Sequence, residues 1–467
     1  MTDPLAALRP PLAAAAPGGW IVGGALRDAA LGAPVRDVDL AVPGDAGDAA
    51  RRLASATGAA RFPLSGAFGS WRLTGGSLGV QVDITPLQGT SIEEDLARRD
   101  FTVNAMAVPV SGPAEVVDPT GGAADARAGV LRAASGHALD DDPVRVLRAV
   151  RIGQGYGLAI DGATRAACRR SAPRLWDAPG ERLRAEVYAM ARLPRADLAF
   201  AGLDDLGGLG VLVPELEDGR GMEQNAFHHR DVLGHTLAVV ENGCAIAADP
   251  SGVFRDAAPA IARDLAELAG DDVTRREVMV LSCLLHDMAK PATRAVAPDG
   301  RVTFMHHDTV GADAAAALME RLRAARRVVE AVAACVRWHL VIGFMIHLQP
   351  LSLRQLDRFF RTVGTVDTES FALSAADRLA TRGVRSRDAQ LRRHLRLVYE
   401  LAAVRPAWRA RAAEPPVLRG DEIARIVGRA PGPWLADAVE RLRVEQLMRP
   451  GMTVPAARRF VRGLIPE

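Results

Sequence analysis

The chain has 467 residues, which is too long for one hydrophobic core and predicts two to four domains. Hydrophobic residues at 49% and charged residues at 24% are ordinary for a globular enzyme, and aromatic residues at 4% are too sparse for a base-stacking sheet of the RNA-recognition type. The net charge of +2 is nearly neutral, so charge alone does not predict nucleic-acid binding.

The four cysteines are scattered and form no Cys-x-x-Cys pair, so neither a disulfide framework nor a zinc ribbon is predicted. The amino-terminal segment lacks the basic region of a signal peptide, and we expect none. We find no apolar stretch of 18 residues in the sequence and therefore expect no membrane span. A cytoplasmic protein is predicted.

Short apolar runs separated by glycine-rich turns predict a small sheet between residue 20 and about residue 120. The predicted strands are Trp20 to Val22, Val38 to Val42, Trp71 to Leu73 and Val80 to Ile84. A short helix, Ala25 to Leu31, is predicted between the first two strands. Beyond about residue 126 the apolar spacing becomes helical, most clearly at Asp142 to Gly153 and Gly180 to Leu193.

Glycines gathered between residues 207 and 221 predict a boundary near 215–225. Residues 226 to about 400 again have helical spacing, and a proline-containing stretch near 405–416 precedes a last helical segment. The pattern therefore predicts a small α/β head followed by three helical pieces.

The first predicted strand runs into a Gly-Gly turn, formed by Gly23 and Gly24, that opens the short helix. Backbone N–H groups exposed at such a turn can cradle a triphosphate, and Arg27 can add positive charge beside it. An ordinary strand-to-helix turn has the same pattern, so this signal does not identify a site by itself.

The second predicted strand carries two carboxylates, Asp37 and Asp39, that alternation places on one face, while Val38 and Leu40 turn to the core. Two such carboxylates can bridge divalent cations that activate a hydroxyl and stabilise a leaving pyrophosphate. Asp83, on a later strand, is a candidate third metal carboxylate. The alternative for each is a solvated strand residue.

These motifs resemble a known family. The pattern G-G-x-x-R-D followed by R-D-x-D resembles the head of polymerase-β-like nucleotidyltransferases, which include bacterial CCA-adding enzymes and poly(A) polymerases. The segment from Arg98 to Met106 is similar to that family's R-R-D-x-x-x-N-A-M element. The resemblance implies that Arg99, Asp100 and Asn104 contact the sugar and phosphates of the incoming nucleotide.

The segment from Asp141 to Arg148 resembles the family's E/D-D-x-x-R-x-L-R element. Three-residue spacing predicts that Asp142 and Arg145 share one helical face, where a salt bridge is the alternative to a function. The resemblance implies that this pair selects the incoming base by hydrogen bonds, and that Arg148 supports nucleotide binding.

One further segment resembles the family, and one departs from it. The segment Glu181-Arg182 to Glu186 resembles the family's E-R-x-x-x-E helix, which we expect to be scaffolding. Relatives often have an arginine shortly after the third-carboxylate strand, whereas residues 85–88 here are Thr-Pro-Leu-Gln. This departure concerns the loop that assists the switch from C to A addition.

Eight of the ten histidines fall between residues 228 and 347. The residues in the order of an HD-type metal site are His235, His286, Asp287 and Asp377. His307 and His339 add ligands at a spacing that resembles binuclear variants, whereas His228 and His229 are less well placed. The HD resemblance implies hydrolysis of phosphate esters by a metal-bound water, and a degenerate, inactive domain is the alternative.

The resemblance thus predicts a multidomain α+β chain whose head is polymerase-β-like, with a mixed sheet plus helices, followed by all-α parts. The predicted domains are a nucleotidyltransferase head at 1–125, a helical neck with the base-selecting helix at 126–222, an HD-type phosphohydrolase domain at 223–404 and a helical, tRNA-binding tail at 405–467. We expect Mg²⁺ in the head, and Mg²⁺ or a divalent transition metal in the HD site.

The predicted activity is that of a CCA-adding enzyme, which adds CMP and AMP from CTP and ATP to the tRNA 3′ end and releases pyrophosphate. Within the same chemistry, the alternatives are a poly(A) polymerase and a CC-only or A-only enzyme. A different class is an RNA-end or nucleotide phosphohydrolase whose head only binds RNA. A non-enzymatic RNA-binding module would not need both metal clusters.

Overall fold

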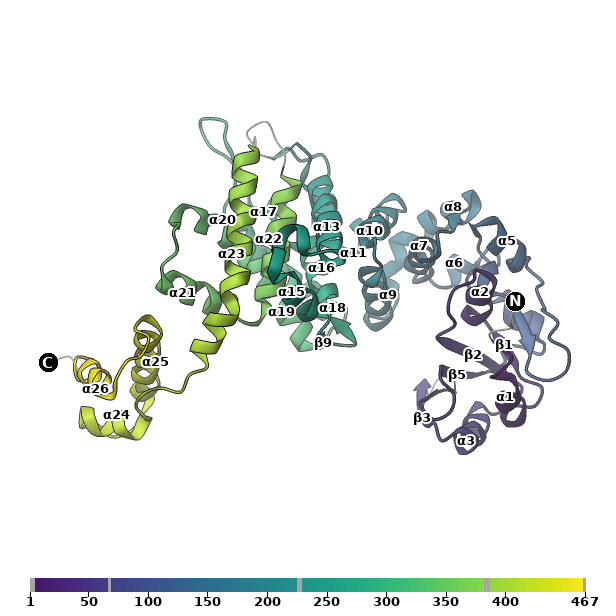
Figure 1. The fold of residues 1–467 in the computed structure, drawn as a ribbon. Coiled ribbons are helices and arrows are strands. Elements are labelled where there is room, and N and C mark those ends of the chain that lie inside the picture. The colour runs from purple at the N-terminus through teal and green to yellow at the C-terminus, as the bar shows by residue number, and fades with distance from the viewer. Residues whose placement is uncertain (1–4, 66–68, 225–228, 382–386, 465–467) are drawn as a thin grey trace. The chain divides into compact units, whose positions relative to one another are not determined.

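The computed structural model describes residues 5–65, 69–224, 229–381 and 387–464. The chain forms two compact units, Met1–Pro214 and Glu215–Glu467, and each is described by itself. The first holds a small mixed sheet followed by helices, and the second is mainly helical (Figure 1). The predicted α+β class is confirmed.

The sheet of the first unit has six strands in the order β3-β4-β5-β2-β1-β6. Its strands are β1 Trp20–Val22, β2 Asp37–Val42, β3 Ala60–Ser65, β4 Ser70–Thr74, β5 Gln81–Pro86 and β6 Ala107–Pro109. β2 and β5 are parallel, and the other neighbours are antiparallel. The four predicted strands are confirmed, whereas β3 and β6 were missed because each contains a proline and lies at a sheet edge.

The two faces of this sheet are covered differently. One face packs on α1 Arg9–Ala15 and α3 Ala46–Thr57 around a core that contains Val38, Leu40 and Ile84. α3 begins where the Asp45 carboxylate accepts hydrogen bonds from two backbone N–H groups, and it ends at a left-handed glycine, Gly58. On the other face, a smaller cluster of Val22 and Ala41 packs against α4 Ile92–Ala97 and the turn after it. Much of this second face stays open.

Helices complete the first unit. They are α2 Gly24–Ala30, α5 Gly122–Ala128, α6 Ala138–Asp141, α7 Arg145–Tyr156, α8 Gly162–Ser171, α9 Gly180–Arg192, α10 Ala196–Asp205, α11 Leu209–Leu212 and α12 Pro214–Asp218, the last of which crosses the border of the unit. A short parallel pair, β7 Val130–Leu131 and β8 Ala159–Ile160, lies among them. α7 packs against α9 and α10.

The helix predicted to start at Asp142 begins three residues later, at Arg145. Asp142 has extended backbone angles, φ −149° and ψ 101°, and is followed by Pro143. A residue that precedes proline is disfavoured in the helical region, which explains the later start. The prediction that Asp142 and Arg145 share one helical face was therefore wrong, although the two side chains remain neighbours.

A helical bundle forms the centre of the second unit. Its long helices are α13 Val232–Ala248, α16 Arg275–Leu285, α18 His307–Arg321, α19 Arg326–Trp338, α22 Asp367–Ala380 and α23 Asp388–Ala412. The other helices between them are α14 Ser251–Phe254, α15 Ala258–Leu265, α17 Lys290–Thr293, α20 Val341–Met345 and α21 Leu353–Val363. Two small hairpins, β9 Leu268–Gly270 with β10 Val273–Thr274 and β11 Arg294–Val296 with β12 Val302–Phe304, depart from the all-helical expectation.

The last three helices, α24 Gly420–Val427, α25 Pro433–Met448 and α26 Val454–Arg462, surround a small core of their own. The border expected at 404/405 falls inside α23, which continues through Pro406. Arg405 explains this continuation, because its guanidinium forms buried ion pairs with Asp264 at 2.6 Å and Asp367 at 3.0 Å. The border expected at 125/126 likewise falls inside α5.

One segment of the described chain, Arg326–Leu348, has the length and apolar composition of a membrane-crossing helix, since an 18-residue window within it has mean hydropathy 1.6. The expectation that no such stretch exists was therefore wrong. In the structure the segment is divided into α19, α20 and a short 3-10 turn, and α19 packs against α16, α18 and α22. Because core helices of bundles pass the same test, the segment is weak evidence for a membrane span.

Candidate functional site

The three predicted head carboxylates lie together on the open face of the sheet. Val38 and Leu40 are buried on the opposite face, whereas Asp37 is exposed and Asp39 is half-buried. In the parallel pair of β2 and β5, Asp39 lies directly opposite Asp83. Direct cross-strand partners project to the same face of a sheet, so Asp39 and Asp83 are neighbours.

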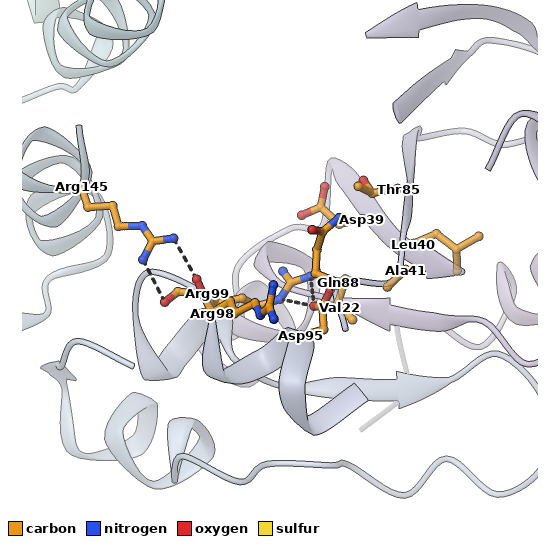
Figure 2. A pocket seen from close by; sticks show the side chains of 10 residues that line it. All are labelled: Val22, Asp39, Leu40, Ala41, Thr85, Gln88, Asp95, Arg98, Arg99 and Arg145. Carbon is orange, nitrogen blue, oxygen red and sulfur yellow. Dashed lines mark hydrogen bonds and ion pairs between the residues drawn. The ribbon is translucent and has the colours of Figure 1, made fainter. Parts of the chain in front are cut away.

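A cavity of about 310 Å³ opens beside Asp39 (Figure 2). Its lining residues are Val22, Asp39, Leu40, Ala41, Thr85, Gln88, Asp95, Arg98, Arg99 and Arg145. The pKa of Asp39 is raised to about 6, because burial and the carboxylates of Asp83 and Asp37, which raise it, outweigh Arg99, which lowers it. The cavity therefore joins Asp39, whose carboxylate neighbours are Asp37 and Asp83, with three arginines, which suits a metal-bound polyphosphate.

Gly23 brings Arg99 and Asp39 together at the edge of this cavity. Its backbone has φ +74°, and a Cβ atom there would lie 2.9 Å from both Arg99 Nη1 and Asp39 Oδ2. Only glycine fits without strain. The Gly23 N–H, however, donates to the carbonyl of Met106 at 3.4 Å, so it does not contribute to the phosphate cradle predicted for the Gly-Gly turn.

Arg27 does not line the cavity but lies in the interior. Its guanidinium donates to Asp28 Oδ1 at 2.9 and 2.7 Å, to Asn104 Oδ1 at 2.9 Å and to the Tyr156 hydroxyl at 2.6 Å. It also lies over the Tyr156 ring, 4.2 Å from its centroid. These contacts occupy Arg27 internally, in contrast to the predicted role beside the triphosphate.

Asp100 and Asn104 continue the same buried network. Asn104 Nδ2 donates to Asp100 Oδ1 at 2.9 Å, and Asp100 Oδ2 accepts from Arg148 Nε at 2.7 Å. Arg148 and Arg151 then both pair with Glu186 on α9, at 3.2 and 2.6 Å. Burial by itself raises the pKa of Asp100, but Arg148 and the hydrogen bond from Asn104 hold it well below the usual range. The network joins the motif after α4 to α7 and α9.

The predicted base-selecting pair lies beside the cavity. Arg145 donates to the backbone carbonyls of Arg98 at 2.8 Å, Ala138 at 3.0 Å and Arg99 at 3.3 Å, two of which Figure 2 shows. Asp142 Oδ2 lies 2.5 Å from an Arg182 nitrogen and 3.9 Å from Arg145 Nε. The E-R-x-x-x-E helix therefore holds one member of the pair, and backbone carbonyls hold the other.

Sequence reasoning missed Arg72, whose guanidinium binds both oxygens of Asp83. Nε lies 2.8 Å from Oδ1 and Nη2 lies 2.6 Å from Oδ2. Arg98, Gln88 and Asp95 were also missed as cavity-lining residues. Asp95 holds Arg99 by an ion pair at 3.0 Å. Arg98 is the first residue of the R-R-D element, whereas no local motif marks Arg72, Gln88 or Asp95.

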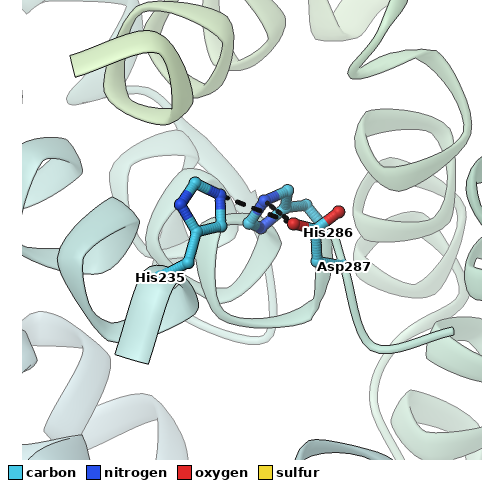
Figure 3. A group of neighbouring side chains, drawn as sticks. All are labelled: His235, His286 and Asp287. Atoms are coloured by element: carbon cyan, nitrogen blue, oxygen red, sulfur yellow. Dashed lines mark ion pairs between the residues drawn. The ribbon is translucent and has the colours of Figure 1, made fainter. Parts of the chain in front are cut away.

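The six predicted HD residues converge in the second unit from different elements. Figure 3 shows His235 of α13 facing His286 and Asp287, which follow the end of α16. His235 Nε2 lies 3.5 Å from Asp287 Oδ2 and 3.1 Å from Asp377 Oδ1 of α22. On the other side, Asp287 Oδ1 lies 3.4 Å from His307 Nε2 and 3.8 Å from His339 Nε2. Asp287 therefore bridges two potential ligand groups.

Three imidazole rings are oriented by the same local contact. The Nδ1 atoms of His286, His307 and His339 lie 2.9, 2.6 and 2.6 Å from the carbonyl oxygen three residues earlier. A proton on Nδ1 satisfies each carbonyl and leaves the Nε2 lone pair facing the cluster. The buried His286 Nε2 lies 3.0 Å from Asp287 Oδ2, although it forms no well-aligned hydrogen bond with the residues that the structure describes. Such oriented, unused lone pairs fit a divalent metal.

The protonation states of the HD residues also fit a divalent metal. Burial, together with the neighbouring His286, lowers the pKa of His339 to about 4. Burial opposes the charge of Asp287, but His286 and Lys290 hold its pKa well below the usual value. Lys290 Nζ, which belongs to the only lysine of the sequence, lies 2.7 Å from Asp287 Oδ2. His229 is exposed, and His228 lies outside the described residues.

Three family matches cover much of the chain. Residues 80–132 match the poly A polymerase head domain, and residues 157–219 match a probable RNA and SrmB binding site of polymerase A. Residues 232–382 match the HD domain. The first and third matches contain Asp83, the R-R-D element and the six clustered HD residues.

Relatives of similar length carry closely related names. The chain is 34% identical to an A-adding tRNA nucleotidyltransferase of Deinococcus radiodurans, over 97% of each chain. It is 32% identical to a CC-adding tRNA nucleotidyltransferase of Thermus thermophilus, over 94% of this chain and 92% of the relative. It is 30% identical to a multifunctional CCA protein of Pseudomonas paraeruginosa, over 88% and 95%.

The fold is also similar to solved structures. An apo form of a CCA-adding enzyme aligns with a TM-score of 0.64 at 17% identity, over 99% of this chain and 95% of that one. A CCA-adding enzyme in complex with ATP aligns with a TM-score of 0.63, over 96% and 91%. These likenesses confirm the fold predicted from the motifs.

Proposed function

Because the chain belongs to the family of tRNA nucleotidyltransferases, we propose that its head adds CMP and AMP, from CTP and ATP, to the 3′ end of tRNA. The observation that carries this proposal is the position of Asp39 beside a cavity lined by Arg98, Arg99 and Arg145, with Asp37 on the same face. In the reaction, the tRNA 3′-hydroxyl oxygen bonds to the α-phosphorus, the bond from that phosphorus to the β-phosphate oxygen breaks, and pyrophosphate leaves.

Asp37 and Asp39 are the residues that would hold Mg²⁺. Their oxygens are the ligands that this hard cation prefers, and the pKa of Asp39 is raised mainly by burial and also by the neighbouring carboxylates of Asp83 and Asp37. When bound, Mg²⁺ supplies the charge that activates the hydroxyl and stabilises the leaving pyrophosphate. Arg99, fixed between Asp95 and Gly23, is placed to bind a phosphate group.

The nucleotide is selected, in this proposal, by Asp142 and Arg145. Arg145 presents paired donors and Asp142 presents acceptors toward the Watson–Crick edge of a base. The buried network of Arg27, Asp100 and Asn104 supports the site by holding the R-R-D element in place. Arg148 acts with them through Asp100.

A second candidate function is the addition of only one kind of nucleotide, CC or A. It is favoured by the three carbonyls that hold Arg145, since a fixed side chain presents one set of donors. It is also favoured by the link from β5 to α4, residues 87–91, which contains no arginine. A poly(A) polymerase remains an alternative within the same chemistry.

For the second unit, we propose a metal-dependent phosphohydrolase acting on phosphate esters, with RNA ends as the substrate class. His235, His286, Asp287 and Asp377 would form one metal subsite, and Asp287, His307 and His339 the other. Histidine-rich ligand sets suit divalent transition metals, and a bound metal supplies an acidified water. We further propose that the chain divides into head, neck, HD domain and tail, that the tail binds tRNA, and that the protein is cytoplasmic.

The experiment that tests the main proposal offers the protein tRNA that ends before CC, after CC or after CCA, with labelled CTP or ATP. Extension of the first two ends identifies CCA addition, extension of only one of them identifies a CC-only or A-only enzyme, and growth beyond CCA identifies a poly(A) polymerase. Failure to extend any end contradicts the proposal.

Two substitutions separate the two classes of activity. We expect Asp37→Ala to remove extension and to leave hydrolysis of phosphate esters unchanged. We expect His286→Ala to remove hydrolysis and to leave extension unchanged. If extension survives Asp37→Ala while His286→Ala removes all activity, the head only binds RNA and the protein is a phosphohydrolase.

A further inference from the structure

A row of charged residues crosses the open face of the head sheet. Arg72 of β4 lies directly opposite Asp83 of β5, and Asp83 lies directly opposite Asp39 of β2. Since direct partners project to one face, the three side chains stand side by side. Arg72 lies on the far side of Asp83 from Asp39, because β5 is the middle strand of the three.

Arg72 binds Asp83 through a fork that uses both carboxylate oxygens, at 2.8 and 2.6 Å. An arginine that binds both oxygens of a carboxylate occupies the side through which a cation would bind the same two oxygens. The Asp83 carboxylate therefore faces β4, where Arg72 binds it. The metal-binding pair Asp37 and Asp39 lies on β2, on the other side.

Arg72 also balances the charge of this row. Its hydrogen bonds to Asp83 raise the pKa of the guanidinium, burial opposes this, and the carboxylates of Asp37 and Asp39 add to the rise. The pair is only part-buried, with 32% of the Arg72 side chain and 19% of the Asp83 side chain exposed. Arg72 and Asp83 together are close to neutral, so the remaining negative charge of the row is that of Asp37 and Asp39, which Arg99 offsets in part.

We propose that Arg72 is a positioning residue that keeps Asp83 out of the divalent-ion site of the head. The ion is then held by Asp37 and Asp39, and the Arg72–Asp83 pair is a neutral neighbour that limits the affinity for the ion. This inference rests on the proposed function of the head and revises the predicted role of Asp83 as a third metal carboxylate.

The test measures Mn²⁺ binding to the full chain, by the electron paramagnetic resonance signal of free Mn²⁺, without nucleotide or tRNA. The second unit also offers metal ligands, so binding to the head is the difference between each protein and its Asp37→Asn/Asp39→Asn counterpart. The variants are Arg72→Met and the double substitution Arg72→Met/Asp83→Asn. Circular dichroism checks that each variant is folded.

Arg72→Met frees the Asp83 carboxylate beside the site, and we expect it to tighten Mn²⁺ binding about tenfold, a change of the size that partners of metal ligands produce. The double substitution replaces a neutral pair by another neutral pair, so its affinity should stay within about twofold of the unaltered protein. Arg61→Met is the matched control. It removes a positive charge from β3, where Arg61 lies over the Trp71 ring, without touching Asp83, and should leave the affinity within about twofold.

Two results overturn the inference. If the double substitution weakens Mn²⁺ binding about tenfold or more, Asp83 is a ligand in the unaltered protein. If Arg72→Met weakens Mn²⁺ binding, Arg72 helps to hold a metal ligand in place and does not keep Asp83 away from the ion.

Failure of the proposed function has a different signature. If Asp37→Asn/Asp39→Asn binds as much Mn²⁺ as the unaltered protein, the head holds no ion at these carboxylates, and both the proposed metal site and the inference fail. If that site is present and the unaltered protein extends tRNA, weaker Mn²⁺ binding by Arg72→Met/Asp83→Asn overturns the inference about Arg72. The proposed function of the head then still stands.

Discussion

The Nε2 atoms of His307 and His339 lie only 3.2 Å apart, while the Nδ1 atom of each ring lies 2.6 Å from a backbone carbonyl oxygen. If both Nδ1 atoms carry the proton, the two Nε2 atoms meet lone pair to lone pair. Two nitrogens bound to one metal at about 2.0–2.1 Å lie about 3 Å apart, so the spacing suits shared coordination.

This geometry predicts that a divalent transition metal stabilises the second unit. A metal at a hundredfold excess over its dissociation constant adds about 2.7 kcal/mol to the free energy of unfolding. We expect Mn²⁺ to raise the melting temperature of the EDTA-treated protein in calorimetry, and His339→Gln to remove most of that rise. His347→Gln, which alters an exposed histidine, serves as the control. An equal rise in His339→Gln and in the unaltered protein contradicts the prediction.

A second prediction concerns Gly23, where an added Cβ meets Arg99 and Asp39 at 2.9 Å. Gly32 is a matched control, because its φ of +69° is similar and a Cβ added there would meet no atom within 4 Å. Both alanine substitutions carry a backbone cost because φ is positive. That cost is about 1–2 kcal/mol in the left-handed region and larger at Gly23, whose ψ of −134° lies outside that region. Only Gly23→Ala displaces the groups beside the cavity.

We therefore expect both substitutions to lose stability in urea unfolding, with the larger loss in Gly23→Ala, whereas only Gly23→Ala lowers kcat/KM for tRNA extension, by about a hundredfold. Equal losses of kcat/KM in the two variants would show that backbone strain, and not displacement of Arg99 and Asp39, limits the activity.

The parts of the site that the sequence predicts are those that depend on local order. Alternation along one strand places Asp37 and Asp39 on one face, and this holds wherever the strand pairs. The HD residues were found because their types and order are characteristic, although the elements that carry them are far apart in the chain. Local patterns also predicted four of the six head strands.

The parts that the sequence does not predict depend on partners that are distant along the chain. The Arg72–Asp83 pair follows from the register of β4 against β5. Arg27 was expected beside a phosphate, but its partners Asn104 and Tyr156 are 77 and 129 residues away and draw it into the interior. Burial of an arginine is settled by such long-range hydrogen bonds, which no turn motif specifies.

A third prediction tests nucleotide selection by Arg145. Arg145→Met removes the paired donors and the bonds to three backbone carbonyls. We expect kcat/KM for the preferred nucleotide to fall about a hundredfold and discrimination among the four nucleotides to shrink, because each lost donor pair costs roughly 1–3 kcal/mol. Competition assays with CTP, ATP, GTP and UTP measure both effects. Arg127→Met, at an exposed residue of α5, should change neither; a uniform fall for all four nucleotides would assign Arg145 to general binding.

A fourth prediction concerns the buried network between the R-R-D element and α7. Asp100→Asn removes the charge that Arg148 Nε contacts at 2.7 Å and leaves a part-buried guanidinium with Glu186 as its remaining acidic partner. Breaking one partner of a buried ion pair costs about 3–5 kcal/mol, so we expect a loss near the lower limit in urea unfolding. Asp437→Asn, whose exposed carboxylate pairs with the exposed Arg441, should cost less than about 1 kcal/mol. Similar losses for the two variants would contradict a structural role for the network.

The fifth prediction uses His394 of α23, a buried histidine outside the metal cluster. Burial lowers its pKa to about 4, Asp377 raises it and Arg378 lowers it, and its Nε2 lies 2.9 Å from the Ser374 hydroxyl. The unfolded chain, with an ordinary histidine pKa near 6.5, binds a proton more readily than the folded one. The neutral ring therefore contributes its full stability above about pH 6.5, and that contribution falls as the pH drops toward 4.

The two pKa values correspond to about 3 kcal/mol lost between pH 6.5 and pH 4. His394→Gln keeps a hydrogen-bonding group beside Ser374 but cannot titrate in this range. We expect urea unfolding of the variant to depend less steeply on pH over this interval than that of the unaltered protein. The comparison isolates His394, because the histidines of the metal cluster titrate alike in both proteins. Parallel pH profiles would mean that His394 is protonated with equal ease in the folded and unfolded chains.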